Sequence, residues 1–203
     1  LISFFIKLFA AELIFTYKMK GRKHFWSRII LGCLFSLGIQ YGYDSILNAV
    51  FPESLSHAWY LSLFVLQLIT STAVLYVSFD CSASKAVLCG TAGYAVQNCT
   101  YWMLFFFRYV TGLNIQHPIG IEYLDEVVNI LLFAVCYTPF FIWIYHQDKR
   151  REEVEVPTVS MVIVSVLIVL LAVVMSSYIP FGKDSILYYI YSVVSCLLVI
   201  AIQ

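Results

Sequence analysis

A run of polar side chains interrupts an apolar stretch at residues 80–109, near the middle of the chain. Four of them recur at four-residue intervals: Lys85, Cys89, Gly93 and Gln97. In an α-helix this spacing places them along one stripe. An amide buried in hydrocarbon needs a hydrogen-bond partner, because leaving it unpaired costs several kcal/mol. The stripe is therefore expected to face other helices or a wet cavity, with the segment as the central helix of a bundle.

The other candidates for ligand binding are amides and carboxylates in or beside further apolar segments. An ionisable group within a membrane is a functional candidate by default. With the amide of the stripe, the candidate set is Gln40, Asp44, Gln97, Asn98, Asn129, Glu122, Asp125 and Glu126. Two interpretations are open for the amides, a binding site or interhelical hydrogen bonds. For the last three acids the alternatives are a site for a cationic ligand and a solvated helix start.

Two residues are candidates for hinges. Gly93 lies within the polar stripe, and Pro139 lies inside the apolar segment 124–145, which it should kink. A further pair of small residues, Gly38 and Gly42, has the spacing that lets a neighbouring helix backbone approach closely.

Composition indicates a membrane protein. Hydrophobic residues make up 62% of the 203 residues and charged residues only 12%, whereas soluble domains average about 25% charged residues. The formal net charge is zero, so no overall basic field suggests nucleic acid as a partner. The sequence predicts an all-α, polytopic transmembrane helical bundle with the lipid bilayer as its surroundings.

Charge and turn signals separate about seven apolar segments. They cover residues 1–17, 29–49, 58–79, 83–107, 124–145, 158–178 and 185 onward. Basic residues concentrate in alternate connections: Lys18, Lys20, Arg22, Lys23, Arg28, Lys85, Lys149, Arg150 and Arg151. The positive-inside rule places these connections in the cytoplasm. The N-terminus is then outside and the C-terminus cytoplasmic.

The chain starts at Leu1 and stops at Gln203 within an apolar run. Residues 1–203 are therefore predicted to be a single transmembrane domain cut from a longer chain. No HExxH, Walker loop, GxSxG or metal-spaced Cys/His cluster occurs, so neither catalytic residues nor a metal site are predicted. All six cysteines lie in or beside apolar segments without a CxxC motif, and are expected to be small buried side chains.

One stretch resembles a known family. The residues CSASKAVL at 81–88, continued by GYAVQN at 93–98, are similar to the membrane sensor regions of bacterial histidine kinases with a GHKL-type ATPase domain. That class includes Agr-type peptide receptors. In the family a short polar turn precedes a helix with a Tyr and then Gln-His. Here Tyr94 and Gln97 fit the pattern, and Asn98 stands where the family has His.

The resemblance implies a multi-pass protein of the bacterial plasma membrane that senses an extracellular or membrane-borne signal, such as a peptide or small ligand, as a homodimer. A signalling helix, a phosphoacceptor domain and an ATP-binding domain would follow Gln203, and ATP and Mg would bind only there. No cofactor is expected in residues 1–203.

Two alternatives to the sensor interpretation are open. One is a small-solute transporter or its substrate-binding subunit. The other is a membrane cysteine peptidase that pairs His24 with Cys33 or His146 with Cys136.

Overall fold

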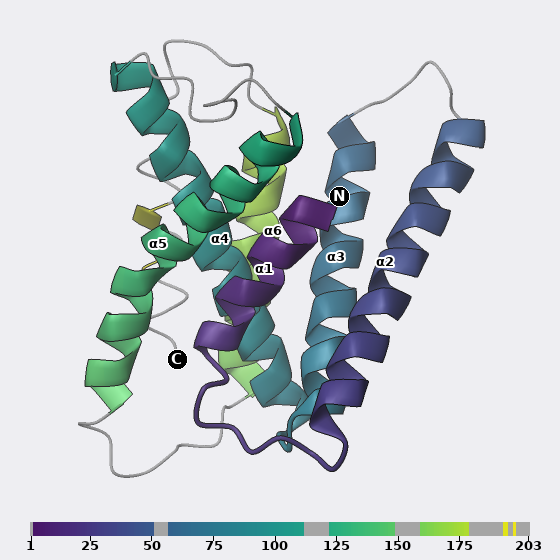
Figure 1. Cartoon of the computed structure of the whole chain (residues 1–203), viewed down its shortest axis with the longest axis vertical. Coiled ribbons are helices and arrows are strands. Elements are labelled where there is room, and N and C mark those ends of the chain that lie inside the picture. The colour runs from purple at the N-terminus through teal and green to yellow at the C-terminus, as the bar shows by residue number, and fades with distance from the viewer. Residues whose placement is uncertain are drawn as a thin grey trace.

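The computed structural model describes residues 2–50, 57–111, 122–148 and 159–178, together with 193, 194 and 197. Over these residues the chain is all-helical and forms no β-strand, which confirms the predicted all-α class (Figure 1). The six helices are α1 (Ile2–Ile14), α2 (Phe25–Val50), α3 (His57–Ser78), α4 (Ala83–Thr111), α5 (Glu122–Asp148) and α6 (Val159–Tyr178). They correspond to the first six predicted segments, with ends that differ by up to four residues. The seventh segment lies largely outside the described residues.

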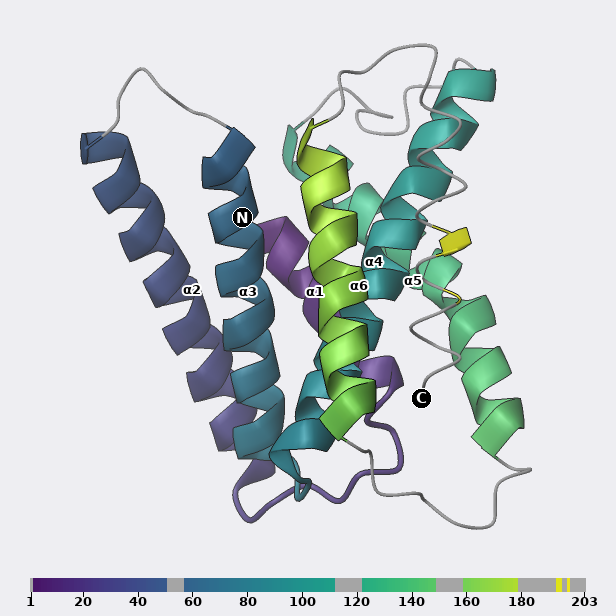
Figure 2. The same cartoon turned by 180° about the vertical axis from the view of Figure 1, so that it is seen from behind.

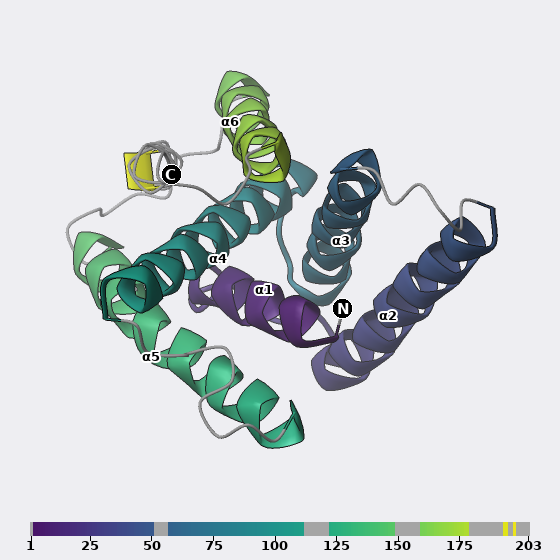
Figure 3. The ribbon, with the colours of Figure 1, turned by 90° about the horizontal axis from the view of Figure 1, so that it is seen from above.

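Helix α4 is the centre of the bundle, as its polar stripe predicts. It packs against α1, α3, α5 and α6, and Figure 3 shows these helices arranged around it. Ala92 and Val96, at its middle, have no exposed surface. Seen from behind, α6 crosses in front of α4 and stands beside α3 (Figure 2), and it packs against both. Helix α2 stands at the edge of the bundle beside α3.

Helix α1 is short and buried. Its 13 described residues rise about 20 Å. Leu8, Ala11 and Glu12 have no exposed surface, because α1 packs against α3, α4 and α5. After Ile14 the chain turns, and Thr16 bonds back to the carbonyl of Leu13 through both its N–H and its hydroxyl, at 3.1 Å each.

Two of the described helices are long and apolar enough to cross a membrane. They are α2, with a mean hydropathy of 1.2, and residues Leu124–His146 of α5, with 2.1. Shorter apolar runs occupy Ser62–Ser78 of α3 and Val159–Leu171 of α6. The described residues therefore support two of the predicted spans, and the number of about seven stays a prediction.

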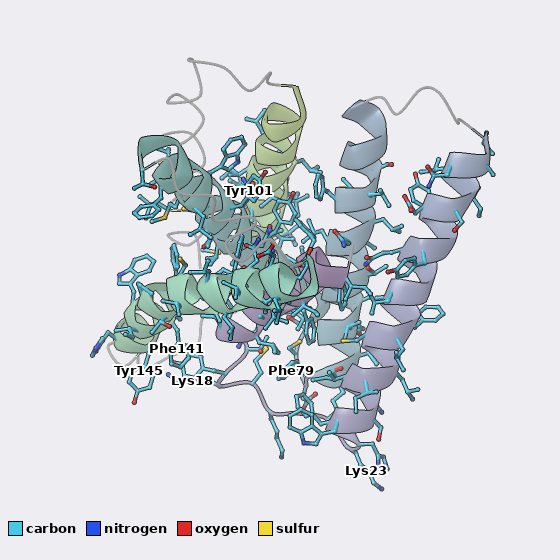
Figure 4. The ribbon with its side chains drawn as sticks, turned by 45° about the horizontal axis from the view of Figure 1, so that its top comes forward. Lys18, Lys23, Phe79, Tyr101, Phe141 and Tyr145 are labelled. Carbon is cyan, nitrogen blue, oxygen red and sulfur yellow. The ribbon has the colours of Figure 1, made fainter. Side chains whose placement is uncertain are left out.

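The connections α1–α2 and α3–α4 are joined at one end of the bundle. Arg22 donates its N–H to Ser78 O and Asp80 donates its N–H to Lys20 O, both at 2.9 Å. The Arg28 guanidinium donates to Val77 O at 3.1 Å, which satisfies a carbonyl of the last turn of α3. Figure 4 shows the side chains of Lys18 and Lys23 at this end. The basic residues 18–28 and the residues around Lys85 thus meet at one end of the molecule, here called the basic end.

Candidate functional site: a buried polar layer

A carboxyl group is buried in the middle of the bundle. Glu12 of α1 has no exposed surface, and its Oε1 accepts a hydrogen bond of 2.6 Å from the hydroxyl of Ser71 on α3. The same hydroxyl lies 3.2 Å from the carbonyl oxygen of Leu68. The second carboxyl oxygen, Oε2, has no hydrogen-bond partner among the described residues. A buried ionisable group inside an apolar bundle is the strongest chemical feature of the described chain.

Gly93 of α4 is what allows Glu12 to sit so deeply. A Cβ atom at this glycine would lie 2.6 Å from Glu12 Cα and 2.7 Å from Glu12 N. Both are main-chain atoms, so a side chain there would have to push α1 away. The polar stripe on α4 therefore faces α1 at this point, and Cys89, one turn earlier, places its Sγ 3.7 Å from Phe15 O.

A second polar group joins α2 to α3. Gln67 donates a hydrogen bond to Gln40 Oε1 at 2.9 Å, and Gln40 donates to Thr70 Oγ1 at 3.3 Å. Gln40 and Gln67 are 0% and 1% exposed, so these amides satisfy each other away from solvent. This pairing is what an amide requires in an apolar bundle.

The two groups form one continuous layer through α3. Gln67 and Ser71 are four residues apart and therefore neighbours on one side of the helix, with Thr70 beside them. The buried polar layer, as we name it, crosses from α2 through α3 to α1 and ends at Gly93 on α4. It consists of Gln40, Gln67, Thr70, Ser71 and Glu12.

Of the predicted amides and Asp44, only Gln40 belongs to this layer. Gln97 is buried on α4 and Asn98 is half-buried. Asp44 and Asn129 are also half-buried, but α2 and α5 lie on opposite sides of the bundle (Figure 3). The structure therefore does not bring Asn129 together with Gln40 or Asp44 around one cavity, as the transporter interpretation expects.

The predicted acidic group lies at the start of α5. Glu122 begins the helix, and its side chain lies outside the described residues. Asp125 is buried, whereas Glu126 is exposed and interacts electrostatically with Lys7 of α1. The ammonium group of Lys7 also lies 4.5 Å from the ring centroid of Phe133, a cation–π contact.

Gly93 and Pro139, the two predicted hinges, both lie inside continuous helices. Helix α4 continues through Gly93, which is a contact point with α1, and α5 continues through Pro139. In Figure 1 the ribbon of α5 changes direction part-way along its length.

The glycine pair of α2 makes no close helix contact in the described chain. A Cβ atom added at Gly38 or Gly42 would have no other atom within 4 Å. The expectation of a close helix contact there is wrong within the described chain, because α2 turns this face away from its neighbours.

Neither proposed cysteine–histidine pair is within reach. Cys33 follows His24 by nine residues at the start of α2, and His146 follows Cys136 by ten within α5. At a rise of 1.5 Å per residue, each pair is separated by more than about 13 Å along the axis. None of the described cysteines forms a disulfide, and Cys89 and Cys99 are buried.

The sequence interpretation missed Glu12, Gln67, Thr70 and Ser71. Glu12 could have been found by the rule applied to Asp44, because it too is an ionisable residue within an apolar segment. The polar residues of α3 have the helical spacing i, i+3, i+4, although the sequence does not reveal which helices they face.

Comparison with known proteins adds no family assignment. No protein-family model, curated protein or solved structure matches the chain. Among the described residues, no three histidine, cysteine, aspartate or glutamate side chains gather as metal ligands. The buried polar layer is therefore the feature on which an interpretation of function has to rest.

Proposed function

We propose that this chain is the multi-pass membrane sensor region of a bacterial histidine kinase of the GHKL class. The kinase class is proposed from the resemblance of residues 81–88 and 93–98. One observation supports the membrane part of the proposal: a bundle with a polar layer in its interior and apolar side chains on its surface. Trp26 and Phe35 of α2 are 73% and 71% exposed, and Val135 of α5 is 68% exposed. Exposed apolar surface with buried polar groups suits a lipid environment, where backbone and side-chain polar groups must be satisfied internally.

The proposed arrangement in the plasma membrane has about seven spans with the basic end in the cytoplasm. Lys18, Lys20, Lys23 and Arg28 lie at that end together with the α3–α4 turn. Tyr17 packs there on Phe141 and Tyr145, with ring centroids 5.6 and 6.1 Å apart. Basic residues on the cytoplasmic side and aromatic residues near the interface support this orientation.

The proposed mechanism is a shift between two packings of the bundle, biased by a ligand that binds one of them better. Helices α4 and α5 carry the hinge candidates Gly93 and Pro139 and are proposed to move against α1, which touches both. Near the start of α5, away from the basic end, Glu126 is exposed and Asp125 is buried beside it, and an extracellular peptide or small ligand is proposed to bind at Glu126. Glu126 interacts with Lys7, so a ligand there would act on α1 directly. A homodimer is proposed from the resemblance.

The experiment is to isolate the native polypeptide from membranes, determine its intact mass and C-terminal peptides, and assay autophosphorylation with ATP and Mg²⁺. The proposal expects a polypeptide longer by roughly 200 residues, the size of one or two domains, that phosphorylates itself. In this full-length polypeptide, the substitution Gln97→Leu should abolish the change in autophosphorylation caused by the signal, while the folded protein still accumulates. A polypeptide without an ATP-binding region would refute the proposal.

A small-solute transporter is the second candidate, and Glu12 is the observation that favours it. Ionisable residues buried in membrane proteins mark substrate and proton pathways. Stabilisation of the purified protein against heat by a small solute, without autophosphorylation, would support the transporter.

A further inference from the structure

The hydrogen bonds around Glu12 indicate whether its carboxyl group carries a proton. The Ser71 hydroxyl lies 2.6 Å from Glu12 Oε1 and 3.2 Å from Leu68 O. A hydroxyl carries a single hydrogen, so it cannot donate to both acceptors. If Oε1 carries a proton, Glu12 donates to Ser71 Oγ and Ser71 donates to Leu68 O. One added proton therefore satisfies both contacts, and 2.6 Å is an ordinary distance for an O–H···O bond.

An ionised Glu12 would be poorly stabilised at this position. Its only hydrogen-bond donor among the described residues is one neutral hydroxyl, and Oε2 has none. Burying a carboxylate without a counter-charge costs many kcal/mol. A protonated acid leaves Oε2 as a neutral carbonyl oxygen, whose unpaired burial costs about 1–3 kcal/mol.

No positive side chain in the described structure neutralises Glu12. Lys7, on the same helix, faces Phe133 and Glu126 of α5. The titratable groups that interact with Glu12 from its neighbours are the thiols Cys33 of α2 and Cys89 of α4. From α3 the facing group is Ser71. A hard metal cation needs about six oxygen ligands, more than Glu12 and Ser71 supply.

We propose that Glu12 is a proton-binding site that is loaded when α1 is seated against α3 and α4 and emptied when α1 moves away. Gly93 lets α1 approach closely enough to exclude water from the carboxyl group. Withdrawal of α1 would hydrate that group and favour release of the proton. The ratio of seated to withdrawn protein would then fall as the pH rises, by up to about tenfold per pH unit. This holds over the pH range in which the seated state keeps the proton and the withdrawn state has released it. The proposal concerns the packing of α1, so it is independent of the kinase assignment.

The test is infrared spectroscopy of the purified native protein in lipid bilayers at neutral pH, with and without ¹³C labelling of glutamate. The expected result is a carbonyl band of a protonated carboxylic acid that shifts on glutamate labelling. Labelling separates Glu12 from Asp125, which is also buried. The band should be absent in Glu12→Gln and present in Glu126→Gln, a matched change of an exposed acid.

Absence of a glutamic acid band from the native protein at neutral pH would overturn the proposal, and this result needs no variant to fold. A band that persists in folded Glu12→Gln would overturn it as well. The glutamine variant is expected to fold, because its amide can donate to Ser71 Oγ as the protonated acid does. If it does not accumulate, Glu12→Asp serves instead: the band must then lose its shift on glutamate labelling.

Discussion

Replacing Gly93 by alanine tests whether α1 is held where the structure places it. The added Cβ would lie 2.5 Å from Glu12 Cγ, 2.6 Å from Glu12 Cα and 2.7 Å from Glu12 N. Carbon atoms in contact prefer about 3.5–4.0 Å, so α1 must retreat by about 1 Å. The side chain of Glu12 could rotate away, but its two main-chain atoms cannot move without the helix.

The expected loss of stability is about 1–3 kcal/mol, the usual cost of overpacking a well-packed interior. This corresponds to a roughly 5- to 150-fold change in the unfolding equilibrium. Gly38→Ala is the matched control, because an added Cβ there meets no atom within 4 Å. Both changes replace a helical glycine, so the gain in helix propensity, about 0.5–1 kcal/mol, is common to them and cancels in the comparison.

The assay combines unfolding in detergent micelles with alkylation of Cys89. This thiol is buried and lies 3.7 Å from Phe15 O, just beyond the end of α1. Displacement of α1 should therefore speed its alkylation in Gly93→Ala, while Gly38→Ala leaves it protected. Equal stability and equal protection of Cys89 in the two variants would refute the seating of α1 against α4.

Two further predictions concern the buried polar layer. Changing Gln40 and Gln67 to leucine, singly and together, should give a coupling free energy of about 0.6–2 kcal/mol in a double-mutant cycle; additive effects would mean that the two amides do not bond. The stability of the native protein should fall as pH rises from about 4.3, where a glutamate of the unfolded chain releases its proton. The loss is at most about 1.4 kcal/mol per pH unit and continues for as long as the folded chain retains the proton at Glu12. Thermal unfolding of Glu12→Gln should lack this part of the pH dependence, and an unchanged slope would contradict it.

The helices and the central place of α4 could be predicted from local sequence. Apolar segments of helical length are interrupted by charge and turn residues, and these signals locate the six described helices. The polar stripe of α4 also indicates its central position, since polar side chains in a membrane have to face other helices.

The composition of the site could not be predicted in the same way. Gln40 was recognised as polar, but its partner Gln67 follows only from knowing that α2 packs on α3. The spacing of Gly38 and Gly42 shows that a helix could approach, not that one does. Conversely, Gly93 has no special spacing with Glu12, and their contact arises from the crossing of α1 and α4.

The measurement that bears most directly on the proposed membrane arrangement is cysteine labelling in intact cells. In a chain whose native cysteines are replaced, single cysteines would be placed at Lys23, at the basic end, and at Asn48, near the other end of α2; both positions are exposed. The 26 residues of α2 rise about 39 Å, enough to cross the bilayer. A membrane-impermeant maleimide should label the cysteine at position 48 in intact cells and the one at position 23 only after permeabilisation. The reverse pattern, or labelling of both in intact cells, would contradict it.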